Sequence, residues 1–332
     1  MVFTARLTVL GSLNMDISVT VPDLPVPGAT VLGRAAVFAP GGKGANQAVA
    51  AARLAREAGM PVAMIGCAGD DDFGRTLRAA LRAEGVDDGA VRTVAGVPTG
   101  IAMITVDRAG ENMITVSPGA NHEVSAADIA GLAVEAGDVL VISAEVPIPL
   151  IGAALAATAG RALRVLNLAP APPPAKAAEL VALGPDWLVV NESEAAAVLG
   201  RAVAGLAEAA EAASDLVAAG ARNAVVTAGA AGAAYCAPAA TKTTTTTAAA
   251  DVPNVVTVPG FKVTAVDTVG AGDTFVGALA VALAAGVPPL DAVTAAAAAG
   301  AAAAARPGTQ SGMPSPADVL AATGHPWPVP AS

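Results

Sequence analysis

Aromatic residues, histidine and cysteine are scarce in this chain of 332 residues. Only 2% of the residues are aromatic although 54% are hydrophobic, so the core must be built from Ala, Val and Leu through many small contacts. The two histidines, His122 and His325, make histidine-dependent triads and H-E-x-x-H zinc sites poor interpretations. The two cysteines, Cys67 and Cys236, lie far apart and predict neither a disulfide framework nor a zinc site.

Basic residues are also a minority. The chain has 18 Lys and Arg against 28 Asp and Glu, and its formal net charge is −10. We find no basic stripe and therefore expect no nucleic-acid partner. No uninterrupted apolar run reaches membrane-spanning length, and Met1–Leu10 lacks the layout of a signal peptide, so we expect no membrane partner. A reducing, cytoplasmic location fits these features.

Strands and helices alternate from residue 125 onward. Short apolar runs at 139–142, 164–167, 187–190 and 224–227 predict strands, and the segments between them predict helices. This alternation is typical of an α/β fold with a mostly parallel sheet covered by helices. Further strands are expected at 7–10, 16–21, 31–38, 62–67, 255–258 and 263–266. In the N-terminal part of the chain, helices are expected at 45–58 and 73–84.

The chain is expected to form one domain over residues 1–322. Extra strands within about 14–38 and 98–117 do not follow the α/β alternation, and we expect them to form a small β-sheet lid. Residues 237–252 are rich in Ala and Thr and predict a low-complexity loop insertion. Residues 323–332 are expected to be a tail with a loose end from Pro326.

A glycine loop, Gly270–Gly272, separates the strand expected to end at Val266 from a helix that begins near Asp273. Glycines allow backbone N–H groups to face a ligand, and a helix N-terminus favours an anion. An acidic side chain there would repel phosphate, unless it serves to accept a proton from an attacking hydroxyl during phosphoryl transfer. An ordinary glycine turn with Asp273 as a helix cap explains the loop equally well.

Two earlier segments carry groups suited to a polyol. Pro40–Gln47 is a glycine loop at a helix start with one amine and two carboxamides, and Asn14 and Asp16 share one face of a strand edge. Taken singly, a capped helix start and a routine strand edge explain both segments. The dinucleotide fingerprint fails because Phe275 occupies its third glycine position, and the Walker loop fails because Gly44 follows Lys43.

Taken in order, these segments resemble the ribokinase-like family of sugar and nucleoside kinases from about Leu7 to Met313. Intermediate blocks agree as well, namely residues 66–74, 110–112, 118–121 and 145–147. The resemblance implies a three-layer α/β/α fold with a β-sheet lid, and ATP-dependent phosphorylation of D-ribose at O5 with Mg²⁺. The alternatives are another kinase of the family, acting on deoxyribose or an adenosine-like nucleoside, or, less readily, a non-catalytic sugar-binding regulator. A nicotinamide-dependent oxidoreductase is weakened by the glycine spacing.

The resemblance also implies residue roles. Asp273 would be the general base, and the anion hole would consist of Gly270, Ala271 and Gly272. The sugar would be bound by Asn14, Asp16, Gly42, Lys43, Asn46, Glu145 and Asp273. ATP would be bound by Asn191, Thr227, Gly229, Gly232 and Gly272. Asn191 and Glu194 would hold Mg²⁺ indirectly, and activating K⁺ would lie among Asp267, Val269, Ala303, Arg306, Gly308 and Ser311.

Some of these residues have simpler explanations without the family. Asn191 and Glu194 would be a helix cap and its capping-box partner, and Glu145 a solvated loop carboxylate. The chain also departs from the family at Ala296, where members often have Asn or His near the adenine. The unpaired edges of the lid strands predict a homodimer formed through the lid, as is common in the family.

Overall fold

A nine-stranded sheet forms the centre of the molecule. The computed structural model describes residues 5–132, 134–238 and 254–330. The strand order is β13-β12-β11-β10-β9-β8-β1-β4-β5, and every pair is parallel except β11–β12 and β12–β13. The bounds are β1 Leu7–Leu10, β4 Val62–Gly69, β5 Val86–Val94, β8 Val139–Ser143, β9 Leu163–Asn167, β10 Trp187–Asn191, β11 Ala224–Thr227, β12 Gly232–Ala237 and β13 Asn254–Pro259.

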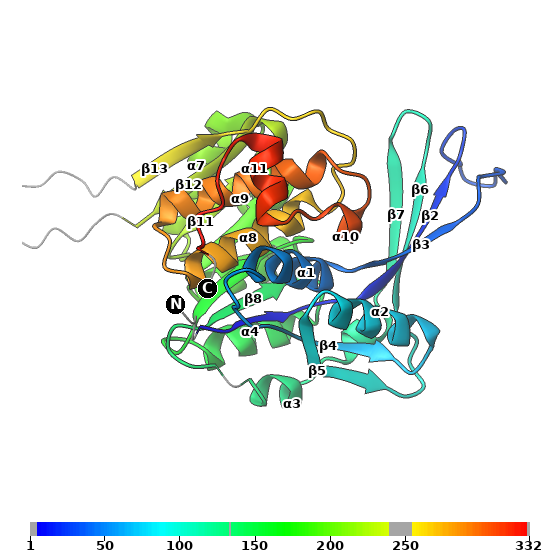
Figure 1. Cartoon of the computed structure of the whole chain (residues 1–332), viewed down its shortest axis with the longest axis horizontal. Helices are drawn as coiled ribbons and strands as arrows, with labels where there is room; N and C mark the ends of the chain where they lie inside the picture. The colour runs from blue at the N-terminus through cyan, green and yellow to red at the C-terminus, as the bar shows by residue number, and fades with distance from the viewer. Residues whose placement is uncertain (1–4, 133, 239–253, 331–332) are drawn as a thin grey trace, which may run out of the picture.

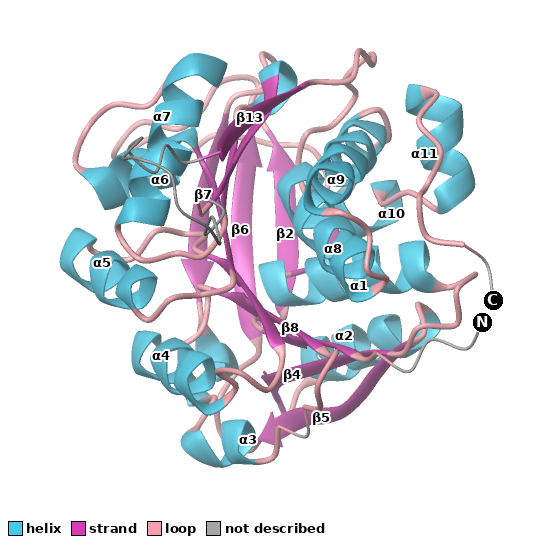
Figure 2. Ribbon diagram, turned by 90° about the vertical axis from the view of Figure 1, so that its left-hand side faces the viewer, coloured by secondary structure: helices cyan, strands magenta, loops and turns pink. Residues whose placement is uncertain are grey.

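Helices cover both faces of this sheet (Figure 2). One face carries α1 Lys43–Ala55, α2 Asp72–Ala83, α8 Ala271–Ala284, α9 Pro289–Ala304, α10 Thr309–Gly312 and α11 Pro316–Thr323. The other carries α3 Ala126–Ala130, α4 Ile148–Ala157, α5 Pro174–Ala182, α6 Glu192–Leu199 and α7 Gly205–Ala218. Side chains alternate across the strands, so Val9 packs into one core and Leu10 into the other. The expected three-layer α/β/α fold is confirmed.

The lid is a separate four-stranded sheet at one end of the molecule (Figure 1). Its order is β3-β2-β6-β7, with bounds β2 Asn14–Thr20, β3 Val37–Gly41, β6 Gly100–Val106 and β7 Asn112–Ser117. Strand β2 begins three residues after the end of β1, and β3 leads almost directly into α1. The base of the lid therefore lies beside the carboxyl ends of the central strands, where open α/β sheets bind ligands.

Small residues allow α1 and α8 to approach closely. A Cβ atom built on Gly277 of α8 would lie 2.7 Å from the carbonyl oxygen of Gln47 and 3.0 Å from the Cβ of Ala50. Real Cβ atoms essentially never show the shorter of these distances. The contact therefore needs glycine on α8 and tolerates only alanine on this part of α1, which is consistent with a core poor in aromatic residues.

Several expected elements differ in the structure. Residues 263–266 form no strand, because the N–H groups of Val266 and Asp267 bind the carbonyl oxygen of Ala304 at the end of α9, and Val266 is 61% exposed. Of the strand expected at 31–38, only residues 37–38 lie in a strand, at the start of β3. Helix α3, before the strand expected at 139–142, ends at Ala130 and is followed by Gly131. Strands β5 and β12 and helix α11 were not anticipated.

The two irregular segments of the sequence have different outcomes. Residues 239–253, most of the expected insertion, lie outside the described residues, and β12 and β13 on either side pair antiparallel. The end of the chain is not loose as far as residue 330, because Trp327 packs against the core and Val329 is only 7% exposed. In the part of the chain that the structure describes, no helix has the length and apolar character needed to cross a membrane.

Candidate active site

The N-terminus of α8 presents the glycine loop and Asp273 together. Gly270 precedes the helix with φ 80°, a left-handed conformation that favours glycine. The first N–H groups of a helix have no partner within it and can bind an anion, although the N–H of Ala271 donates to the Thr268 carbonyl oxygen at 3.2 Å. A Cβ atom on Gly272 would meet no atom within 4 Å, which leaves space in front of this turn. Asp273 itself is buried, with 8% exposure.

Two carboxamides of α1 hold the Asp273 carboxylate. Asn46 Nδ2 donates to Oδ2 at 2.9 Å, and Gln47 Nε2 donates to Oδ1 at 3.1 Å. Gln47 Nε2 also donates to Asn167 Oδ1 at 2.9 Å, at the end of β9. The sequence pattern marked both carboxamides as suited to a polyol, but the family resemblance gave a role only to Asn46, and Asn167 was not singled out. Only the packing of α1 against α8 reveals that Gln47 reaches the same carboxylate.

Acidic groups surround one lysine at this site. The pKa of Lys43 is raised, chiefly by the charge of Asp273, with contributions from Glu145 and Glu194 that act against desolvation. Burial, together with the charges of Glu145 and Asp273, raises the pKa of Asp16 to about 7. The pKa of Glu194 is raised mainly by burial, which the nearby Lys43 partly offsets. The five groups are therefore connected by electrostatic interactions that centre on Lys43 and Asp273.

The loop after β1 connects to the carboxylate that follows β8. Glu145 Oε2 accepts a short hydrogen bond from Ser12 Oγ and a second from the backbone N–H of Lys43 at 3.2 Å. Ser12 also accepts from the N–H of Gly44 at 3.4 Å. Glu145 is therefore not the solvated loop carboxylate of the simpler interpretation, and Ser12 is a further residue that the sequence did not single out.

Asn14 is held from the side by Asn121. The Asn121 amide donates to Asn14 Oδ1 at 2.8 Å and also bonds the backbone N–H and carbonyl of Leu13. A Cβ atom on Gly41 would collide with the Asp16 carboxylate. Gly42 has φ 90°, and a Cβ atom there would lie 2.6 Å from the backbone nitrogen of Asn14. Glycine is therefore needed where this loop passes the base of the lid.

The residues expected to bind nucleotide lie at the ends of β10 and β11. Asn191 and Thr227 are partners in the parallel register of these strands, and Gly229 and Gly232 belong to the turn between β11 and β12. Asn191 and Glu194 form a capping box at the start of α6, as the simpler interpretation holds. Ala296 of α9 is fully buried and offers no surface to a ligand.

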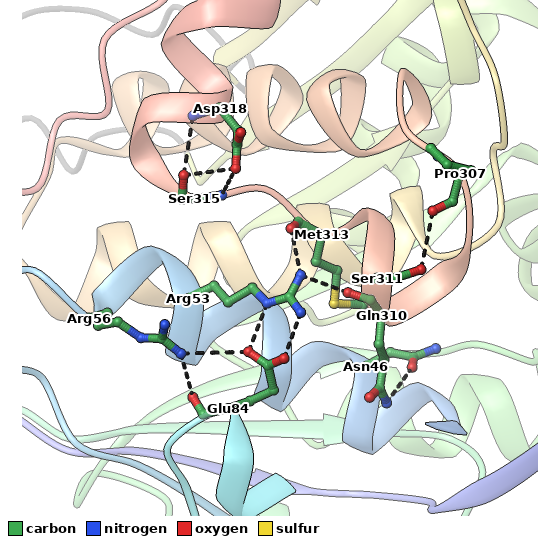
Figure 3. A network of polar contacts seen from close by, with 10 residues as sticks. All are labelled: Asn46, Arg53, Arg56, Glu84, Pro307, Gln310, Ser311, Met313, Ser315 and Asp318. Carbon is green, nitrogen blue, oxygen red and sulfur yellow. Dashed lines mark hydrogen bonds and ion pairs between the residues drawn. The ribbon is translucent and has the colours of Figure 1, made fainter. Parts of the chain in front are cut away.

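Asp267 joins the glycine loop to the segment after α9. Its carboxylate accepts from the N–H groups of Val269 and Gly308, each at 3.0 Å. Ala303 lies in α9, next to its last residue, and is buried. The side chains of two other residues in the expected potassium set bind elsewhere. Arg306 pairs with Asp318 at 2.5 Å. Figure 3 shows that Ser311 Oγ donates to the carbonyl of Pro307, at 3.2 Å.

Comparison with known proteins agrees with this geometry. The sequence model described as "pfkB family carbohydrate kinase" matches residues 4–316. The chain belongs to this family. It is therefore an ATP-dependent carbohydrate kinase. Within the family, it is 36% identical to the ribokinase of Schizosaccharomyces pombe over 321 residues, 95% of this chain and 96% of that protein. It is also 32% identical to the deoxyribokinase of Salmonella typhi over 276 residues, 82% and 84% of the two chains.

Solved structures of pfkB-family kinases share the fold. The ribokinase of Thermotoga maritima aligns with a TM-score of 0.77 at 31% identity, covering 96% of this chain and 98% of that one. A ribokinase from Arabidopsis thaliana complexed with ribose and ATP aligns with a TM-score of 0.77 at 28% identity, covering 96% and 98% of the two chains. The similarity therefore extends over the central sheet and the lid alike.

Proposed function

We propose that this kinase phosphorylates D-ribose at O5, producing ribose 5-phosphate and ADP. One observation carries the proposal. The Asp273 carboxylate stands in the first turn of α8, is oriented by amides of α1, and lies within electrostatic reach of Asp16 and Lys43, both of which also interact with Glu145. A base, an anion-binding turn and polyol-binding groups are therefore close together. The similarity to ribokinases over nearly the whole chain supports ribose as the sugar.

In this proposal the sugar hydroxyls are held by Asn14, Asp16, Gly42, Lys43, Asn46 and Glu145. Carboxylates accept hydrogen bonds, ammonium groups donate them, and carboxamides do both, so the set can satisfy both sides of vicinal hydroxyls. The burial of Asn14 and Asn46 supports such a role, since buried polar groups need partners of fixed position. The lid closes over the sugar and excludes water, which would otherwise accept the phosphoryl group.

Asp273 orients the O5 hydroxyl and accepts its proton as O5 attacks the γ-phosphorus of ATP. The bond from phosphorus to the β–γ bridging oxygen breaks, and ADP leaves. Backbone amides of Gly270, Ala271 and Gly272 stabilise the charge on the phosphoryl group in transit. The open space before Gly272 and the left-handed conformation of Gly270 support this role.

Two cations belong to the proposal. Asn191 and Glu194 would hold Mg²⁺ indirectly, and Thr227, Gly229 and Gly232 would bind the nucleotide. The Mg²⁺ would neutralise phosphate charge. Mg²⁺ bound through ATP phosphates needs only one or two carboxylates, which the partly buried Glu194 fits. The Asp267 carboxylate and the carbonyls of Val269, Ala303 and Gly308 would hold K⁺, with Arg306 and Ser311 nearby. The two hydrogen bonds of Asp267 support this assignment because they bring the loops together.

The decisive experiment measures ADP release with ribose, 2-deoxyribose, other pentoses and nucleosides, with and without K⁺. We expect the highest kcat/KM with ribose. A higher value with 2-deoxyribose would assign the chain the activity named for its Salmonella typhi relative. Absence of sugar-dependent ADP release would favour a non-catalytic sugar-binding regulator.

The proposal includes a homodimer formed through the lid in the cytoplasm. The lid exposes the apolar side chains of Val37, Phe38, Met103, Met113, Ile114 and Val116. Burying such a patch against a second copy would remove it from water. A monomeric mass at micromolar concentration in light scattering would contradict the dimer. The two buried, unpaired cysteines suit a reducing compartment.

A further inference from the structure

Gln310 lies outside the set of predicted site residues but forms a hydrogen bond with one of them, Asn46. It lies in α10, is 8% exposed, and donates from Nε2 to Asn46 Oδ1 at 3.1 Å (Figure 3). Asn46 in turn donates from Nδ2 to Asp273 Oδ2 at 2.9 Å. A carboxamide has one accepting end and one donating end. The bond from Gln310 therefore fixes which end of Asn46 faces the Asp273 carboxylate.

The opposite orientation of Asn46 would be unproductive. If the Asn46 amide turned over, its oxygen would face the Asp273 carboxylate and its NH₂ group would face the Gln310 amide nitrogen. Both contacts would then pair groups of the same kind, and an acceptor facing a carboxylate is repelled. With its NH₂ group directed at Asn46, Gln310 opposes this orientation, because an NH₂ group can only donate.

An ion pair outside the site holds Gln310 in place. Helix α10 has only four residues and cannot fix its own position. Arg53 of α1 donates from Nη1 to the backbone carbonyls of Gln310 and Met313, both at 2.7 Å (Figure 3). The other edge of its guanidinium group binds both carboxylate oxygens of Glu84, at 2.8 and 2.6 Å. Such two-point binding fixes the plane of the guanidinium group.

We propose that Gln310 is a positioning residue for phosphoryl transfer, which acts on Asp273 through Asn46 and is held by Arg53. The inference rests on the proposed function, since it assumes that Asp273 is the base. Gln310 is not a catalytic residue in this account, because its side chain bonds Asn46 and not the reacting groups.

A double-mutant cycle tests the path. Gln310→Met keeps the length and packing of the side chain but removes the donor. We expect it to lower kcat by about tenfold, because a base displaced by a fraction of an ångström loses orientation, and to leave the KM for ATP within about twofold. In an Asn46→Ala background the same change should lower kcat by less than about twofold, since the hydrogen bonds that connect Gln310 to Asp273 through Asn46 are already absent. Equal losses in both backgrounds would overturn the proposal.

Arg53 and Arg56 provide a matched pair. Both lie at or near the end of α1, and both pair with Glu84, at 2.6 and 3.5 Å. Of the two, Arg53 donates to the backbone carbonyls of Gln310 and Met313. Arg53→Gln should lower kcat by several fold, and Arg56→Gln should leave it within about 1.5-fold. Equal kcat values for the two variants, at matched thermal stability, would refute the role of Arg53.

The substrate is established first with the unchanged protein, and the variants are then assayed with the sugar that releases ADP fastest. Failure with ribose refutes the proposed substrate and leaves the cycle measurable on the preferred sugar. Additive losses in the cycle refute the role of Gln310 alone.

Discussion

The close contact of α1 with α8 should limit both stability and activity. A Cβ atom on Gly277 would lie 2.7 Å from the Gln47 carbonyl oxygen, about 0.7 Å short of the 3.4 Å at which ordinary contact begins. Gly277→Ala therefore forces the helices apart by a few tenths of an ångström or more. The hydrogen bonds of Asp273 to Asn46 and Gln47, at 2.9 and 3.1 Å, would lengthen towards the limit of a hydrogen bond.

The expected stability change has two opposing contributions. Overpacking a core costs about 1–3 kcal/mol, and replacing glycine by alanine inside a helix gains about 1 kcal/mol. The net loss for Gly277→Ala is thus about 1 kcal/mol. For a chain of 332 residues, that lowers the melting temperature by about 1–2 °C. We expect kcat to fall about tenfold or more, because the misplaced carboxylate no longer aligns with the hydroxyl.

Gly152 of α4 is the matched control. A Cβ atom there would lie 3.5 Å from Leu183 Cδ1, which is ordinary contact, so Gly152→Ala keeps the helical gain without strain. This variant should melt no lower than the unchanged protein and keep its kcat. Calorimetry and ADP-release assays on both variants test the reasoning. If Gly277→Ala is as stable and as active as Gly152→Ala, the close packing does not set the geometry of the base.

Three further outcomes are expected. Asp273→Asn should lower kcat by about 10²–10⁴ with an unchanged melting temperature, and near-normal turnover would remove its role as base. The pKa of Asp16 is raised to about 7, so between about pH 4 and 7 its carboxyl group binds more protons in the folded than in the unfolded chain. Its contribution to the stability of the fold therefore falls as pH rises through this range. Asp16→Asn should flatten that part of a stability–pH curve, and an unchanged curve would contradict the raised pKa. If the ionised carboxylate binds the sugar, the KM for ribose should fall between pH 6 and 8, which initial-rate measurements would reveal, and equal KM values would argue against this contact. Asp267→Ala removes the hydrogen bonds that this carboxylate accepts from the N–H groups of Val269 and Gly308, and should lower kcat and abolish any K⁺ activation. Retained activation in rate measurements would place the cation elsewhere.

The sequence predicted the layers of the fold because buried parallel strands carry a strong apolar signal. Strand β8, all of it buried, is an example. Strand β5 was missed because it is an edge strand with alternating exposed residues and a bulge against β4, and β12 because Ala and Gly dominate it. The strand expected at 263–266 failed for the opposite reason. Its short apolar run resembles a strand, but its neighbours are the end of α9 and solvent.

The candidate site was predictable where a motif carried it and unpredictable where tertiary packing did. Asn46 and Asp273 lie in glycine-loop segments, so local pattern marked both, although no rule of spacing joins residues 227 positions apart. Gln47 was marked only as a carboxamide suited to a polyol, and Asn167 and Gln310 carry no local signal. They became part of the site only through the crossing of α1 with α8 and the return of the chain in α10.

The unusual composition of the chain and its site have one physical connection. A large side chain at Gly277 or Ala50 would separate α1 from α8, and with them the amides from the carboxylate they orient. Larger side chains could fill the same core volume elsewhere, since volume-conserving changes are tolerated in cores. They could not do so at this contact, because hydrogen bonds reach only about 3 Å while a single added methyl group takes up a large part of that distance. Small residues at the crossing of α1 and α8 are therefore required by the geometry of the site, and the alanine-rich remainder of the core is not.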